Sequence, residues 1–434
     1  MMAQRPVRVL HLIAELGGGG SERWLWDVVR LSPPEQFEHT VATIYPDYSG
    51  NFVYADHLRS TGAYKETTEQ PEPGLLHGMI KGLRAQRPRL MAIPLMPFAL
   101  RLGANGLATW RVLKVLMRFR PDVVHAHTLP DFILGMMIRL IFNKPLIHTV
   151  PCIFSQMKDT GYGWMPKLYA RLHPWVDYFS TGEGRSELIS IGIPPAKILY
   201  DLGGVDLSAV DAVQAERERH RREVRESLGL SEDALVALSV GRLHPSKGHA
   251  YALETLPTLV QSFPNLHWVA LGEGEERAAL ESRAKELRVS DHVHLIGFQN
   301  NPFPYFAAAD LYLRTTVLEP ENLSFYQSMA MGLPTVGFDT QQSGADLITK
   351  VGHGHLVANR DAEALGAATA AILTLPDGGR SLGQRGAIYC REHLDLQQSI
   401  RILSSAYAEL ARKGEKRRAK GETKGERRRA KGES

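Results

Sequence analysis

The sequence has few cysteines and no long apolar run. Of its 434 residues only Cys152 and Cys390 are cysteines, and they form no Cys-x-x-Cys pair. This argues against a disulfide framework and favours a reducing compartment. The apolar run at 90–100 holds two prolines and the run at 132–142 holds an arginine, whereas a spanning helix needs about 20 apolar residues. The N-terminus lacks a signal-peptide pattern, so we expect a cytoplasmic protein.

The positive net charge belongs to the C-terminal end. The whole chain has a net charge of +4, but residues 413–434 are a tandem eleven-residue repeat with ten Lys/Arg and four Glu. The repeat has no apolar residue beyond alanine, so we predict a disordered basic tail at 412–434. The tail is either a solvated extension or a contact for an anionic membrane surface. Nucleic acid is the less expected partner.

Strand-like runs alternate with helical runs in two series, which indicates two α/β domains with doubly wound parallel sheets. A chain of this length fits two domains, because single cores stop growing near about 250–300 residues. The first series has strand patterns at 7–14, 39–45, 121–128, 144–150 and 177–184. The second has them at 234–242, 266–274, 292–298, 309–315, 334–339 and 354–359.

Composition suggests where the domains begin and end. The charged segment 215–230 separates the two series, so we predict an N-terminal domain at 1–205, a linker at 206–232 and a C-terminal domain at 233–385. A C-terminal helix at 386–411 is expected to pack back across the domains. The basic amphipathic piece 111–120 fits a helix packed on the sheet, and a membrane-docking helix is the alternative.

The glycine-rich stretch "LGGGGSE" follows the first strand pattern. Glycines there let a phosphate approach the backbone at a helix N-terminus. A dinucleotide fingerprint requires Gly-x-Gly-x-x-Gly/Ala. Counting from Gly17 or Gly18, the third position is Glu22 or Arg23, so a nicotinamide dehydrogenase is disfavoured.

A second loop, "GRLHPSKG" at 241–248, also lies between a strand pattern and a helix pattern. Arg242 and Lys247 can direct two cations at one anion, since arginine forks onto phosphate oxygens and lysine acts as a point charge. A Walker motif is absent. We therefore predict that this loop binds a diphosphate.

The third stretch is "EPENLSFYQSMAMGLP". A helix is expected to begin near Asn322 and to end before Gly332. Gln327 lies one turn past Leu323 and can reach a ligand across the helix start, while Glu319 is placed to touch the far end of that ligand. An ordinary capped helix with no ligand is an equal alternative.

Together the three stretches resemble the family 4 glycosyltransferases over about residues 5–411. The family's first glycine motif matches Gly19 to Glu22, its diphosphate-binding cations match Arg242 and Lys247, and its Glu-x7-Glu motif lies over Glu319 to Pro334. The resemblance implies the GT-B fold, in which two facing Rossmann-like domains enclose an interdomain cleft. It also implies a role in polysaccharide biosynthesis.

What the resemblance implies for function is a metal-independent, retaining transfer without a cofactor. The donor would be a nucleotide-diphosphate sugar on the C-terminal domain, and the acceptor a glycan or polyprenyl-linked lipid on the N-terminal domain. A peripheral position on the inner face of the membrane would suit such an acceptor. The implied catalytic residues are Glu319 and His148, and the implied donor-binding residues are Gly19, Gly20, Arg242, Lys247, Asn322, Leu323 and Gln327.

Two departures from the family pattern bear on activity. Gln327 stands where the family has its second glutamate, so its contact with the donor ribose would lack charge. Pro320 replaces a glycine and has no N–H to donate. Two alternatives therefore stay open, namely a nucleotide-sugar 2-epimerase on the same fold and a non-catalytic nucleotide-sugar-binding protein.

Histidine pairs invite a metal interpretation. His125 and His127, like the pairs 292/294 and 353/355, share a strand face, but no third ligand completes any pair at a readable spacing. No Asp-x-Asp motif occurs in the sequence. We therefore expect no metal site.

Overall fold

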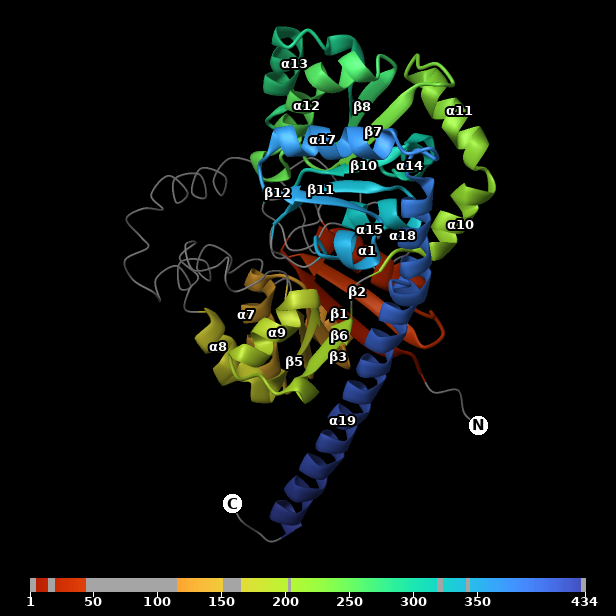
Figure 1. Cartoon of the computed structure of the whole chain (residues 1–434). Helices are drawn as coiled ribbons and strands as arrows, with labels where there is room; N and C mark the ends of the chain where they lie inside the picture. Colours follow the sequence, from red (N-terminus) through yellow and green to blue (C-terminus); the bar gives the residue numbers. More distant parts are fainter. Residues whose placement is uncertain are drawn as a thin grey trace, which may run out of the picture. The chain divides into compact units, whose positions relative to one another are not determined.

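The computed structural model describes residues 5–14, 20–43, 115–150, 165–201, 204–317, 323–340 and 344–430. The chain divides into two compact units, one of Met1–Asp201 with Ile400–Ser434 and one of Leu202–Ser399. The described part of each unit contains a six-stranded parallel sheet with helices on its faces (Figure 1). The prediction of two doubly wound α/β domains is confirmed.

The sheet of the first unit has the strand order β2-β1-β3-β4-β5-β6. Its strands are β1 Val7–Ile13, β2 Phe37–Thr43, β3 Val123–Ala126, β4 Leu146–Thr149, β5 Val176–Thr181 and β6 Ile198–Asp201. Its helices are α1 Gly20–Leu31, α7 Leu129–Phe142, α8 Met165–Leu172 and α9 Gly182–Ser190, with 3-10 turns at His173–Trp175 and Pro195–Lys197. Residues 115–119 are also helical, with Leu116 and Phe119 buried against the core, as expected for a helix packed on the sheet.

Apolar side chains cover both faces of this sheet. One core cluster joins strand residues such as Leu10 and Val124 to Phe132 of α7 and Tyr169 of α8. The cluster on the other face includes Tyr407 and other residues of the C-terminal helix. Burial on both faces explains why apolar residues stand at successive positions in β3 and β4, as at Val123–Val124 and Leu146–Ile147.

The sheet of the second unit has the order β12-β11-β10-β7-β8-β9. Its strands are β7 Leu235–Val240, β8 Leu266–Leu271, β9 Val293–Gly297, β10 Leu311–Arg314, β11 Thr335–Asp339 and β12 Gly354–Ala358. Its helices are α10 Leu207–Ala215, α11 Arg217–Ser227, α12 His249–Ser262, α13 Arg277–Glu286, α14 Phe303–Ala308, α15 Leu323–Ala330, α16 Leu347–Val351, α17 Ala362–Leu373 and α18 Arg380–His393, with 3-10 turns at Pro245–Lys247 and Ser290–His292.

The predicted linker and tail differ from what the structure shows. The predicted linker 206–232 contains α10 and α11, which belong to the second unit. The predicted helix at 386–411 is two helices, the end of α18 and the start of α19 (Leu396–Ala430), the long blue helix of Figure 1.

The prediction of a disordered tail is wrong for residues 412–430, which α19 includes. Lack of apolar residues argues against packing but not against a helix, since Ala, Glu, Lys and Arg all have high helix propensity. The side chain of Lys413 also pairs with Glu409 one turn earlier at 2.6 Å. Among the residues of α19 up to Lys416, whose burial the structure describes, the last buried apolar one is Ala411.

Candidate functional site

The loop after β7 is held closely to the end of β10. Gly248 has φ +65°, and a Cβ atom added there would lie 2.2 Å from the carbonyl oxygen of Thr315, so this position requires glycine. The hydroxyl of Thr315 donates to the carbonyl of Lys247 at 2.9 Å, and the amide of Val317 donates to the carbonyl of Ser246 at 2.9 Å. These contacts fix the backbone position from which the side chain of Lys247 extends.

This loop lies at the point where the strand order of the second sheet reverses. From β7 the chain runs outward to β8 and β9 on one side, then returns to build β10, β11 and β12 on the other. Ligands of doubly wound sheets bind at the carboxyl ends of the strands at such a point. A small pocket is found there, lined by Ser239, Val240, Lys247, His249, Tyr312, Leu313, Arg314, Thr315 and Thr316.

The polar groups of the loop suit an anion. Lys247 is half-buried, and Arg242 is exposed, without an ion pair to any described residue. The loop leads into α12, whose N-terminal amides carry partial positive charge. Burial lowers the pKa of His249 to about 4, so this pocket residue is neutral at neutral pH. Arg242 and Lys247 both lie on this loop, and their binding of a diphosphate stays a prediction.

Helix α15 begins beside the same strand ends. The Ser324 hydroxyl donates to the carbonyl of Val240 at 3.0 Å and lies 2.9 Å from the hydroxyl of Tyr312. Leu323, the first residue of the helix, is half-buried. Gln327 is 6% exposed, and its predicted contact with a ligand stays a prediction.

Every residue of α15 from Phe325 to Ala330 is buried. The helix contacts β10, α18 and α10, and the hydroxyl of Ser324 reaches the last residue of β7, so α15 is enclosed on more than one side. Glu319 and Asn322 lie outside the described residues.

His148, the predicted catalytic histidine, is held by groups of the first unit. The side chain is fully buried, its Nδ1 lies 3.1 Å from the carbonyl oxygen of Ala126, and its Nε2 lies 2.6 Å from the hydroxyl of Tyr169. Since the carbonyl can only accept, Nδ1 carries the proton and Nε2 accepts from the tyrosine. Burial lowers the pKa of His148 to about 3. Both ring nitrogens are therefore engaged, and the geometry gives no support to the predicted catalytic contact.

The glycine-rich loop of the first unit is only partly described. Gly19 lies outside the described residues, and Gly20 is the first residue of α1. No phosphate contact can be assigned to either residue, so their predicted donor-binding role stays a prediction.

Sequence reasoning missed Asp131, at the start of α7 and just beyond the carboxyl end of β3. Its Oδ2 accepts from the amide and hydroxyl of Thr128 at 2.9 and 2.6 Å, whereas its buried Oδ1 has no hydrogen-bond partner among the described residues. Burial raises the pKa of Asp131 to about 7, and the charge of Glu22 adds to this. Thr128 is followed three residues later by an acidic residue, which is a helix-capping pattern. This pattern was the feature of the sequence that could have drawn attention to Asp131. A carboxyl that titrates near neutrality at a strand end is a candidate for proton transfer.

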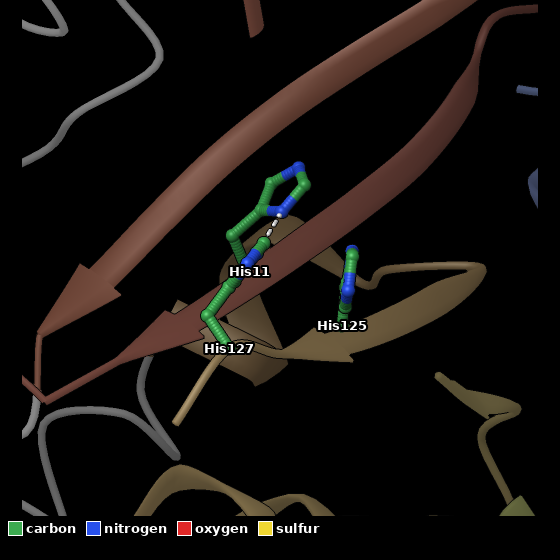
Figure 2. A group of neighbouring side chains, drawn as sticks. All are labelled: His11, His125 and His127. Atoms are coloured by element: carbon green, nitrogen blue, oxygen red, sulfur yellow. Dashed lines mark hydrogen bonds between the residues drawn. The ribbon is translucent and has the colours of Figure 1, made fainter. Parts of the chain in front are cut away.

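A third histidine lies beside His125 and His127 in space, although none joins them at a readable spacing in the sequence. β1 and β3 are parallel neighbours, and their register pairs His11 with His125. One nitrogen of each of these three buried side chains lies within 4.8 Å of the others, as Figure 2 shows for the arrangement of the rings. His11 lies 114 positions before His125 in the sequence, so spacing alone cannot reveal the group.

Two family models match the chain. The model described as Glycosyltransferase Family 4 matches residues 18–209, and the model described as Glycosyl transferases group 1 matches residues 220–388. The two matches follow each other along the chain much as the two structural units do.

Curated relatives cover part of the chain. It is 32% identical over 187 residues to a lipopolysaccharide core biosynthesis glycosyltransferase, LpsE of Rhizobium meliloti, covering 43% of this chain and 52% of that protein. It is 22% identical over 245 residues to the alpha-monoglucosyldiacylglycerol synthase of Acholeplasma laidlawii, covering 52% of this chain and 61% of the synthase. The chain thus spans little more than half the length of these relatives.

Solved structures extend the likeness of fold to nearly the whole chain. HepE of Anabaena, crystallised with UDP and glucose, has a TM-score of 0.70 at 16% identity, covering 93% of this chain and 99% of HepE. WaaG, a glycosyltransferase involved in lipopolysaccharide biosynthesis, has a TM-score of 0.62 at 15% identity, covering 92% of this chain and 99% of WaaG.

The raised pKa of Asp131 predicts a pH-dependent stability. An unfolded aspartate titrates near 3.9, so ionisation of the buried carboxyl opposes folding increasingly as pH rises from about 4 to about 7. Asp131→Asn removes this penalty, and its melting temperature relative to wild type should rise across that interval and level off above pH 7. The measurement is the difference between the two proteins in thermal scans from pH 4.5 to 8.5.

Taking the difference removes the contribution of the buried histidines, whose lowered pKa values change stability in the opposite direction. Asp291→Asn, at an exposed carboxyl of the second unit, is the control and should show no such trend. A difference in melting temperature between Asp131→Asn and wild type that does not change with pH would contradict the raised pKa of Asp131.

Proposed function

Because this chain belongs to the family 4 glycosyltransferases, we propose that it transfers a sugar from a nucleotide-diphosphate sugar to a glycan or lipid-linked acceptor. The observation that carries this proposal is the loop holding Arg242 and Lys247 at the switch point of the second sheet. The sugar bond breaks with its electron pair leaving on the diphosphate. Cations fixed beside that position stabilise the charge where it develops.

Each group of the loop has a distinct task in this proposal. Lys247, held by the contacts of its carbonyl and of Gly248, places one point charge on the diphosphate. Arg242 is exposed and brings a forked donor set to the outer phosphate oxygens. Glu319 orients the sugar, and attack from the side of the departing diphosphate retains the configuration. These last two assignments rest on the family pattern.

The similar proteins favour particular substrates. HepE was crystallised with UDP and glucose, and an Escherichia coli relative is named for UDP-Gal as donor and a diphosphoundecaprenol-linked sugar as acceptor. The Acholeplasma laidlawii relative is named for a glucosyldiacylglycerol. We therefore propose a UDP-sugar donor and a lipid-linked acceptor. No observation on the described residues favours a 2-epimerase.

A lipid-linked acceptor fits a peripheral membrane position. No described helix is long and apolar enough to span a bilayer. The end of α7 exposes Leu140 and Ile141, 63% and 66% exposed. Gly414 of α19 lies against Pro145, just beyond that end, and the basic repeat begins at this point of the helix. An apolar tip beside a basic helix suits an anionic membrane surface.

Loss of either loop cation should impair donor use. Lys247→Ala and Arg242→Ala are each expected to lower the rate of sugar transfer or donor hydrolysis at least about 100-fold, because each removes a preorganised charge from the departing diphosphate. The measurement is UDP release with a panel of UDP-sugars, beside calorimetric titration of UDP. The control is Lys285→Ala, which removes an exposed lysine of α13 and should change neither quantity. Unchanged turnover in the double variant would refute the diphosphate assignment.

Truncation of the basic helix should separate membrane binding from folding. A chain ending at Lys416 keeps every residue of α19 that the structure describes as buried, so its melting temperature should equal that of wild type. Binding to vesicles with anionic lipid should fall at least about tenfold, since each basic residue near such a surface contributes about 1 kcal/mol. Vesicles of zwitterionic lipid are the control. Equal binding of both chains to anionic vesicles would remove the tail from the proposal.

A further inference from the structure

Four histidines from three neighbouring strands meet inside the first unit. His39 comes from β2, His11 from β1, His125 from β3, and His127 from the residue after β3. His11, His125 and His127 are at most 1% exposed. The cluster lies on the face of the sheet that α19 covers, because Tyr407 of α19 reaches the Nδ1 of His125 at 2.6 Å. Such a density of imidazole is not needed to fill a core, which apolar side chains do at lower cost.

Three of these rings form a directional chain. The Nδ1 of His11 lies 2.9 Å from the Nε2 of His127, and the Nε2 of His11 lies 2.8 Å from the Nδ1 of His39. A neutral ring has one N–H, so His11 donates to one neighbour and accepts from the other. Whichever way the protons point, an unpaired donor remains at one end and an unpaired acceptor at the other. Those ends are the buried His39 Nε2 and His127 Nδ1, which have no hydrogen-bond partner among the described residues.

We propose that His11, His125 and His127 bind a divalent transition-metal ion, with Zn²⁺ the first candidate. One nitrogen from each ring already lies within 4.8 Å of the other two. Zn–N bonds of about 2.0–2.1 Å in a tetrahedral site place the donor nitrogens about 3.3 Å apart. The pair from His11 and His127, at 2.9 Å, must open slightly, and His125 must turn toward them (Figure 2). Imidazole is a suitable ligand for Zn²⁺, Cu²⁺ and Ni²⁺.

Partners that orient two of the three proposed ligands, His11 and His125, are already in place. A ligating histidine usually donates its other N–H to a neighbouring acceptor. With the metal on Nδ1 of His11, its Nε2–H donates to His39. His125 contacts Tyr407 through Nδ1 and Thr149 through Nε2, so it keeps one of these contacts and exchanges the other for the metal.

Binding of the metal in this way requires no net gain or loss of protons. Each neutral ring keeps its single proton and moves it to the nitrogen that does not bind the metal, so no proton has to leave the protein. The ion would join β1 to β3 and, through His125 and Tyr407, to α19. This is a structural role within the first unit, separate from the loop of the second unit.

The experiment uses the full chain without a histidine tag, expressed in medium with added Zn²⁺ because a buried site is filled during folding. Metal content is measured by mass spectrometry after gel filtration. The protein is also unfolded, freed of metal with a chelator, and refolded with Co²⁺, whose visible absorption reports tetrahedral nitrogen coordination. We expect one ion per chain, a Co²⁺ spectrum, and a higher melting temperature with Zn²⁺ than without it.

His11→Gln and His127→Gln should lose the bound metal and the Zn²⁺-dependent rise in melting temperature. The matched control is His294→Gln, which removes one member of another facing histidine pair, His267 and His294 at 3.1 Å, where the described residues form no three-ligand group. It should keep both properties. Wild-type protein with no bound metal and no response to Zn²⁺ overturns the proposal, and so does metal that His127→Gln retains. The wild-type result decides even if a variant fails to fold.

Discussion

The close approach of the loop after β7 to the end of β10 determines the rest of the candidate site. No side chain fits between Gly248 and the carbonyl of Thr315, and the hydroxyl of Thr315 closes the contact on Lys247. Because of this contact the loop, the two strand ends and the start of α12 form one fixed corner. A lysine on a flexible loop would lose both side-chain and backbone freedom when an anion binds. The backbone of Lys247 is already ordered, so only the freedom of its side chain is lost.

The two units use the ends of their sheets in different ways. The second unit presents charge at its switch point, with Arg242 exposed and Lys247 half-buried. The first unit buries polar groups, and burial favours their neutral forms, since it lowers the pKa of His127 to about 3 and raises that of Asp131 to about 7. Charged groups near solvent suit an anionic ligand that arrives from water. Neutral imidazoles in a dry interior suit hydrogen bonding or a metal, and they tie strands to the helix that covers them.

Much of the fold could be predicted because strands buried on both faces contain short apolar runs, and loop-forming residues separate these runs in the sequence. The alternation of those runs with helical patterns was enough for two parallel sheets, and the loop with Arg242 and Lys247 was identified from its position between a strand and a helix. Local propensity also explains the error at the tail, where absence of apolar residues was taken as absence of a helix.

The remaining features depend on contacts between distant segments. His11 and His125 meet only through strand register, and the burial of Gln327 follows from the helices packed around α15. His148 was assigned by likeness to a family pattern, but its hydrogen bond to Tyr169 depends on how α8 packs on the sheet. Single-sequence reasoning has no access to any of these contacts.

Hydrogen–deuterium exchange with UDP tests most directly the claim that the loop after β7 receives the donor diphosphate. With saturating UDP, exchange should slow in peptides covering 241–250 and 312–317, because these segments form the fixed corner. Uridine alone, which lacks the diphosphate, should leave 241–250 unprotected. Saturable binding of UDP with no change in 241–250, and protection only elsewhere in the chain, would contradict the account.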